Sequence, residues 1–427
     1  MPDELHAMRG LLDAQGVEIL RVAPTDLFNA IAELTPGANA RLAQTSHAVR
    51  ARLAAMRPLP PTWFYANLDA FPAQREDERR ESMLAELEAK ARRFRLVSID
   101  VAGIKLDEPE PGPLVHPPML APERGAVRFA AVLEASGASL EALDLSFTRI
   151  AEWAEINAAL PACQALQRVT LSGVDFGPAN NPFLGLAQCA ALRELVIDES
   201  DLGLQCQQLM PVLANCRGLE SLTLASNHLC RLDFRLAVAA PVLQHVLGGL
   251  WMHPSLARLD LRNCLLNSGC FDLLAVTLPT CPRLEYLDVS DNNIEQRKIA
   301  GLVRILRGCA ALRHLHMRQS ENLTRNDLRA LAVARVFRGL ASLDLGGCEL
   351  DLMVQGGGSA LLEELPLCVR LASLELGHNS LGNSFVRKLA ALLVRCPALR
   401  RLDVSCGDVT DAGIRALALN VPLCGLT

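Results

Sequence analysis

One apolar frame, Leu-x-x-Leu-x-Leu with Val or Ile sometimes standing in, recurs through the last two thirds of this 427-residue chain. Clear copies begin at Leu284 (Leu-Glu-Tyr-Leu-Asp-Val) and at Leu371 (Leu-Ala-Ser-Leu-Glu-Leu). The ten copies begin at Leu140, Leu166, Leu192, Leu219, Leu256, Leu284, Leu312, Leu340, Leu371 and Leu399. Most successive copies are 26 to 28 residues apart, which leaves room for one short strand and one return helix. A chain of such units is expected to fold as a solenoid rather than as a globule.

The alternation inside the frame predicts a strand whose aliphatic residues at positions one, four and six point inward. Position nine holds Asn227, Cys264, Asn292, Cys348 or Asn379, which can hydrogen-bond the loop backbone where the chain turns away. Between frames, runs such as 297–306 and 384–394 have apolar residues at helical spacing. Because a helix is about 10 Å wide and neighbouring strands lie about 4.8 Å apart, the array should bend with its strands inside. We therefore predict an α/β solenoid, a horseshoe with parallel strands on the concave face and helices on the convex face.

Seven of the fourteen cysteines stand three residues before a frame leucine. They are Cys163, Cys189, Cys216, Cys281, Cys309, Cys368 and Cys396. The same position elsewhere holds Gly137, His253 and Phe337, which indicates a buried packing slot rather than a reactive thiol. This pattern resembles leucine-rich repeat proteins of the cysteine-containing and ribonuclease-inhibitor-like subclasses. Unpaired buried thiols are typical of a reducing compartment, so a cytoplasmic location is expected.

A second pattern lies near the N-terminus. It opens with Pro24-Thr-Asp-Leu27, continues with Ile31 and Leu34, and ends in Arg41-Leu42-x-x-x-Ser46. It resembles the F-box, a helical motif that docks on a Skp-type adaptor of cullin ubiquitin ligases. Carried over by position, the resemblance implies adaptor contacts at Pro24, Leu27, Ile31, Leu34, Leu42 and Val49. The alternative is that residues 20–56 cap the open end of the solenoid.

These patterns divide the chain into three parts. Residues 1–60 are a small helical F-box-like domain, residues 61–139 are a linker, a helix and an N-terminal capping repeat, and residues 140–427 are the ten repeats. Within the middle part, the charged stretch 74–95 predicts an exposed helix with an apolar stripe at Met83, Leu84, Leu87 and Ala91. The segment 96–106 fits the frame and predicts a first strand that closes the sheet. The apolar stretch 236–252 contains Pro241 and is interpreted as an enlarged core helix, not a membrane span.

Charge and motifs exclude several classes of function. A net charge of -5 and 4% aromatic residues argue against nucleic-acid binding. The chain has no metalloprotease, P-loop, nucleophile-elbow or dinucleotide-binding motif, so neither an enzyme nor a bound cofactor is expected. The acidic start lacks the features of a secretory signal peptide. No membrane partner is expected.

Frame positions three, five and seven should present side chains on the concave face. The target-binding patch predicted there consists of Arg258, Arg262, Tyr286, His314, His316 and Arg318, because arginine and tyrosine are enriched at the energetic centres of interfaces. Position five is mostly acidic in the last six repeats, which is interpreted as ordinary strand-surface chemistry. A zinc site at His314-x-His316 is the minor alternative.

The combination resembles F-box proteins with leucine-rich repeats, which recruit substrates to cullin-type ligases. If the source is bacterial, it resembles the GALA class of type III effectors, which are secreted into the host cell. Only Lys90, Lys105, Lys298 and Lys388 are lysines, which fits either codon bias in a GC-rich genome or a receptor with few sites for self-ubiquitination. The alternative function is a plain leucine-rich repeat scaffold or inhibitor whose N-terminal helices are only a cap.

Overall fold

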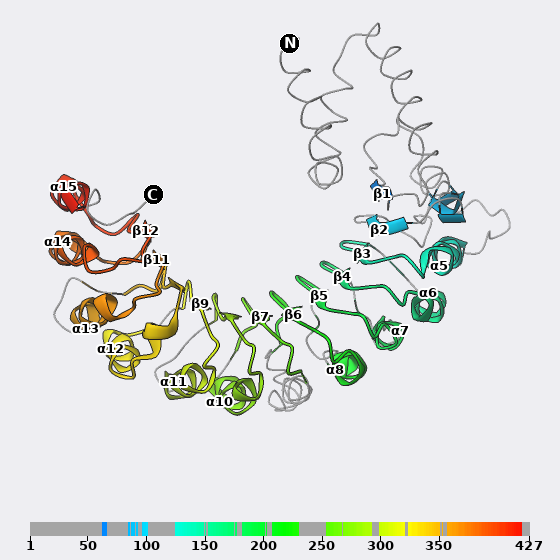
Figure 1. Ribbon diagram of the computed structural model, residues 1–427, viewed down its shortest axis with the longest axis horizontal. Helices are drawn as coiled ribbons and strands as arrows, with labels where there is room; N and C mark the ends of the chain where they lie inside the picture. The colour runs from blue at the N-terminus through cyan, green and yellow to red at the C-terminus, as the bar shows by residue number, and fades with distance from the viewer. Residues whose placement is uncertain are drawn as a thin grey trace, which may run out of the picture.

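The computed structural model shows an arc with strands along its inner edge and helices along its outer edge (Figure 1). It describes residues 62–65, seven helical residues between 84 and 92, 96–100 and most of 124–420. Within the last range the gaps are 149, 151–152, 175, 177–181, 201, 203–206, 230–252, 267, 293–298, 321–322, 351 and 353–356. The predicted adaptor residues 24–49 and the predicted core helix 236–252 lie outside the described residues.

Strands and helices alternate along the described chain. The strands are β1 (Thr62–Tyr65), β2 (Leu96–Asp100), β3 (Ala142–Asp144), β4 (Arg168–Thr170), β5 (Glu194–Val196), β6 (Ser221–Thr223), β7 (Arg258–Asp260), β8 (Tyr286–Asp288), β9 (His314–His316), β10 (Ser342–Asp344), β11 (Ser373–Glu375) and β12 (Arg401–Asp403). The α-helices are α5 (Arg124–Ser136), α6 (Ala154–Ala159), α7 (Phe183–Leu186), α8 (Met210–Asn215), α10 (Ser268–Thr277), α11 (Ile299–Gly308), α12 (Arg325–Val333), α13 (Gly357–Glu364), α14 (Gly382–Leu393) and α15 (Asp411–Asn420). Short 3-10 helices are η3 (Leu160–Ala162), η5 (Leu278–Thr280), η7 (Val336–Gly339) and η8 (Leu365–Leu367).

The described strands form one parallel sheet in chain order from β1 to β12. Each strand from β3 to β12 occupies frame positions three to five. From β2 onward the strands pair in register, so that Leu259 faces Leu222 on one side and Leu287 on the other. The predicted horseshoe is confirmed. Because the register does not slip, equivalent side chains of successive repeats form continuous rows on the concave face.

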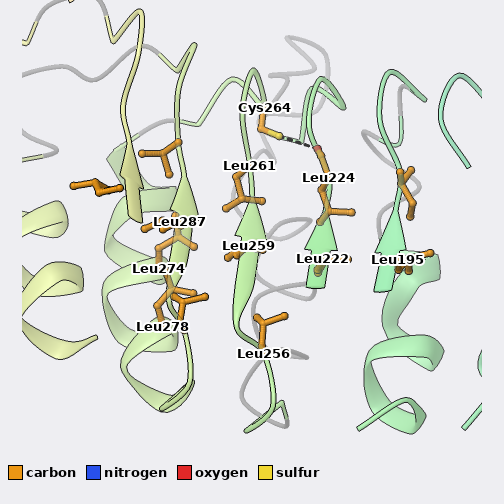
Figure 2. Packing of buried hydrophobic residues seen from close by; sticks show 14 of the residues in the cluster. Leu195, Leu222, Leu224, Leu256, Leu259, Leu261, Cys264, Leu274, Leu278 and Leu287 are labelled. Carbon is orange, nitrogen blue, oxygen red and sulfur yellow. Dashed lines mark hydrogen bonds between the residues drawn. The ribbon is translucent and has the colours of Figure 1, made fainter. Parts of the chain in front are cut away.

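The core lies between the sheet and the helices. Leu256, Leu259 and Leu261 at frame positions one, four and six are all buried, and Leu274 and Leu278 pack against them from the helical side (Figure 2). The equivalent aliphatic residues of the other repeats continue the same cluster. Since each repeat buries its apolar residues only against its neighbours, the core is a long strip rather than a single centre.

Frame position eight has a left-handed backbone in all ten repeats. Eight of these residues are not glycine, namely Phe147, Glu199, Ser226, Asn263, Asp291, Gln319, His378 and Cys406, and the other two are Gly173 and Gly347. A Cβ on Gly173 would lie 2.3 Å from the ring of Phe147, so a side chain here would displace that ring, in addition to the strain of a left-handed backbone. The repeated left-handed residue turns the chain out of each strand.

The N-terminal end of the sheet departs from the sequence analysis in two ways. β1 lies in the region interpreted as linker and pairs in parallel with β2. In addition, Leu84, Leu87 and Ala91 are buried in the common core, so the helix predicted to be exposed is packed on the first repeats. A strand is confirmed at the start of the segment 96–106, as β2, but it is the second strand and does not close the sheet, because β1 pairs with its outer edge. Ser139 donates a hydrogen bond of 2.6 Å to the carbonyl of Leu96.

The cysteine slot is a packing position, as predicted. All seven slot cysteines are buried and form no disulfide, and the Cys189 thiol donates to the carbonyl of Leu160. Burial raises the pKa of Cys163 to about 11 and that of Cys189 to about 12. Where histidine occupies the slot, His253 is fully buried and its Nε2 lies 2.5 Å from the carbonyl oxygen of Leu213.

These slot thiols should resist alkylation in the folded protein. At pH 8, a pKa of about 12 leaves about one Cys189 thiol in ten thousand ionised, and only the thiolate reacts. Peptide mapping after a short iodoacetamide pulse should therefore show Cys189 and Cys216 modified at least about 100-fold more slowly than the exposed Cys406. In urea the three rates should converge. Equal rates under native conditions would contradict burial of the slot.

Candidate partner-binding face

The loops that carry the concave side chains are fixed by polar residues at frame position nine. The Asn292 side chain accepts hydrogen bonds from the N–H groups of Cys264 and Leu266, at 3.1 and 3.0 Å. Its amide nitrogen donates to the carbonyls of Leu261, Val289 and Ser290, at 2.9 to 3.0 Å. Asn227 and Asn379 make corresponding bonds, and the Cys264 and Cys348 thiols each donate to a carbonyl of the preceding repeat at 3.0 Å. The predicted role of position nine is confirmed.

The acidic row at position five has a structural cause. In five repeats an aspartate oxygen accepts a hydrogen bond from the backbone N–H two residues later, at 2.8 to 3.1 Å. These aspartates are Asp144, Asp260, Asp288, Asp344 and Asp403. The bond fixes position seven as the chain leaves the strand, so the acids hold the loop. This agrees with the interpretation of the row as ordinary strand-surface chemistry.

His316 interrupts that row on β9. Its Nδ1 lies 3.4 Å from the Tyr286 hydroxyl and 3.8 Å from a carboxylate oxygen of Asp288 on the neighbouring strand β8. The Tyr286 hydroxyl also lies 3.1 Å from Asp288 and donates to it. A buried carboxylate, a phenol and an imidazole are therefore linked side by side on two adjacent strands.

Tyr286 is the centre of this cluster. The guanidinium carbon of Arg258 lies 3.4 Å from the centre of the Tyr286 ring, which is the geometry of a cation–π contact. The rings of His316 and His314 lie 5.0 and 6.2 Å from the tyrosine ring, measured between centroids. Burial, and the nearby charge of Asp288, raise the pKa of Tyr286 to about 12, so the phenol stays protonated at neutral pH and remains a donor.

Two further arginines stand at position seven above the buried acids. Arg262 is 44% exposed, and its guanidinium lies 4.0 Å from a carboxylate oxygen of Asp260, whose side chain is 7% exposed. Arg318 makes no ion pair among the residues that the structure describes, and glycines 346 and 377 follow it at position seven. Burial raises the pKa of Asp291, while the positive charges of Arg262 and Arg318 both act to lower it. Both arginines therefore lie close enough to interact with the Asp291 carboxylate.

The structure thus brings the predicted target-binding residues onto one face. Arg258, His314 and His316 each lie next to the Tyr286 ring, and Arg262 and Arg318 stand in the next row. The sequence did not indicate that Asp260 and Asp288 lie beneath these side chains, or that Arg258 is stacked on the Tyr286 ring. Burial lowers the pKa of His314, which favours the neutral imidazole. Among described residues, no group of three or more His, Cys, Asp or Glu side chains is arranged to hold a metal ion.

Comparison with known proteins gives the class of repeat. A family model described as leucine-rich repeat matches residues 280–296 and 395–418, which are parts of the repeats that contain β8 and β12. The solenoid is made of leucine-rich repeats. None of the helices in the described part of the chain is long and apolar enough to cross a membrane.

The similar proteins are either much longer than this chain or only distantly similar to it. Mouse Tonsoku-like protein is 31% identical over 235 residues, 53% of this chain and 17% of that protein. Human NACHT, LRR and PYD domains-containing protein 12 is 32% identical over 222 residues, 49% of this chain and 20% of that protein. The chain therefore spans about a fifth of the length of these relatives. An internalin from Listeria monocytogenes covers 87% of this chain and 98% of its own, at 17% identity and a TM-score of 0.42.

Proposed function

We propose that this leucine-rich repeat chain is a non-catalytic recruiter that holds a target protein on its concave face and docks a Skp-type adaptor through its N-terminal segment. The observation that carries the first half is the cluster on β7, β8 and β9. There, arginine, tyrosine and histidine side chains are partly or fully exposed above acids that are almost fully buried. Tyrosine and arginine supply binding energy at interfaces because they combine apolar area with hydrogen-bond donors.

The cluster is preorganised for binding. Tyr286 is fixed by its hydroxyl bond to Asp288 on one side and by Arg258 stacked on its ring on the other. A side chain that is already held loses less conformational entropy when a partner covers it. The exposed ends of Arg262 and Arg318 carry positive charge outward, so the preferred target surface has carboxylates that face these two residues.

The second half of the proposal rests on the F-box resemblance of residues 24–49. Docking by Leu27, Ile31 and their neighbours would bring a target held on the solenoid to a cullin-type ligase. The shortage of lysine supports this role, because a recruiter with four lysines offers few sites for its own modification. A bacterial effector acting in a host cell is one setting for such a recruiter. Without adaptor binding, the same concave face makes the chain a scaffold or inhibitor.

Replacing Arg262, Tyr286 and Arg318 together with alanine should weaken target binding at least about 100-fold, or roughly 3 kcal/mol. Each residue is the kind of anchor whose removal costs about 2 kcal/mol or more at the centre of an interface. The measurement is the dissociation constant for a partner first isolated with the wild-type chain and then purified.

Two arginines on the same face provide the matched control. Arg168 on β4 and Arg401 on β12 stand at frame position three, outside the cluster, and their double alanine variant should bind the target within about twofold of wild type. Adaptor binding should be unchanged in both variants. Target binding that survives the triple substitution, or that is lost equally in the control, would move the target site off β7–β9.

A further inference from the structure

A second surface lies at the turn rim, which we define as the last helical turn of each repeat and the residues that join it to the next strand. Because the strands are parallel and in chain order, these turns stack along one edge of the arc. Between α11 and α12 the rim contains a hollow of about 180 Å³. Its lining includes Leu306, Arg307, Cys309, Arg335, Val336 and Leu340. Cavities of roughly 150 Å³ hold a group the size of benzene, so this hollow accommodates one aliphatic side chain.

Exposed aliphatic residues cluster on the same rim. They are Val276 (57% exposed), Val333 (71%), Leu367 (46%), Val369 (61%) and Val394 (51%). Four of them are valines, placed at or next to the ends of the helical segments between α10 and α14. These five are nearly half of the large apolar side chains that are exposed in the described part of the chain. Four of the five end three neighbouring repeats, those of α12, α13 and α14, and a row of exposed apolar side chains of this kind is suited to a partner rather than to solvent.

The unbalanced charge on the rim is positive. Arg307 and Arg335 line the hollow, and the exposed Arg370 and Arg395 follow in the next two repeats. None of these four arginines forms an ion pair within the described residues. Two acids of these repeats are paired with other arginines: Glu364 is held by Arg338 through two bonds of 2.8 and 2.9 Å, and Asp272 is paired with Arg304.

The backbone at the hollow is also unusual. Arg335 has φ of 58°, and it is the one left-handed non-glycine residue among those described that lies outside frame positions eight and ten. It follows α12, at a position where glycine commonly ends a helix. Instead of glycine, this position carries the long cationic side chain of Arg335, which lines the hollow.

We propose that the turn rim of α11–α14 docks an acidic amphipathic segment of a second partner protein. One aliphatic side chain of this segment enters the hollow, its other apolar residues cover Val333, Leu367 and Val369, and its carboxylates face Arg307 and Arg335. The arrangement favours a protein over an anionic membrane, since surfaces that lie on membranes are anchored by Trp, Phe and Leu, and four of the five exposed apolar residues of the rim are valines. This site is separate from the concave cluster and does not depend on the function proposed for it.

The probe is a fluorescein-labelled helical peptide with leucines at i, i+3 and i+4 spacing and glutamate at its other positions. The full chain should bind it with a micromolar dissociation constant, and a peptide with lysine in place of every glutamate should bind at least about tenfold more weakly. The double variant Arg307→Gln, Arg335→Gln should lower affinity for the acidic peptide by about tenfold or more. Val333→Ser should lower it as well, because it removes apolar contact without changing charge.

The control is Arg329→Gln, an exposed arginine on α12 that does not line the hollow. It should leave peptide binding within about twofold, and so should the concave triple alanine variant. The proposal is overturned if the acidic peptide does not bind, if the lysine peptide binds as well, or if Arg329→Gln weakens binding as much as the double variant. Binding to phosphatidylserine vesicles that the double variant abolishes, with no peptide binding, would assign the rim to a membrane instead.

Discussion

Substituting alanine for Asn292 is expected to lower the free energy of unfolding by about 2–6 kcal/mol, because it removes the side-chain acceptor of two buried backbone N–H groups, at about 1–3 kcal/mol each. Those N–H groups belong to Cys264 and Leu266, and the side chain is fully buried. Three carbonyls also lose a donor. Water cannot replace these bonds without opening the interface between two repeats. Urea unfolding followed by circular dichroism measures the change.

Asn326 is the matched control. It is an exposed residue early in α12, where alanine is a better helix former, so Asn326→Ala should change stability by less than about 0.5 kcal/mol. The Asn292 variant should also unfold with a broader transition, since the loss falls between two repeats of a solenoid. Two variants of equal stability would show that the position-nine bonds contribute little.

The second large effect concerns the N-terminal segment. The double variant Leu27→Ala, Ile31→Ala should reduce binding to a purified Skp-type adaptor by more than about 100-fold, since each buried aliphatic side chain contributes roughly 1.5–3 kcal/mol. The wild-type chain should bind with a micromolar dissociation constant or tighter. Isothermal titration calorimetry on the full chain measures both.

Asn29→Ala with Glu33→Ala gives the control for that experiment. These residues have the same i, i+4 spacing on the polar side of the same predicted helix, so their loss should leave adaptor binding within about threefold. Wild-type protein that does not bind the adaptor at all would favour the capping interpretation. The concave face would then belong to a scaffold or inhibitor.

The repeat architecture could be predicted because its signals are local and periodic. Leu256, Leu259 and Leu261 follow the alternation of a strand, and the cysteine three residues before each frame marks a slot that must be small and apolar. The strand β1 could not be predicted in the same way. Thr62–Tyr65 is four residues long, and β2, the strand with which it pairs among the described residues, lies more than thirty residues later, so no short-range pattern marks it.

The residues of the candidate site could be predicted, but the contacts between their side chains could not. Frame position alone placed Arg258, Tyr286 and His316 on one face. That Arg258 stacks on Tyr286, or that Asp288 accepts the tyrosine hydroxyl, depends on side-chain rotamers across two strands, which the sequence does not encode locally. The hollow of the turn rim could not be predicted either, because helix periodicity does not reveal a space between two helices.

Each strand bonds only to its neighbours in chain order, and this has a mechanical consequence for the whole arc. A rotation between two repeats needs no compensating movement elsewhere, since among the described residues the two ends of the sheet do not pair with each other. Small rotations at successive interfaces add up, as the extensions of springs in series do. The two ends of the arc can therefore move apart or together to fit partners of different width, while the hydrogen bonds within each repeat stay intact. The flexibility of the arc is therefore spread over its repeats rather than concentrated at one of them.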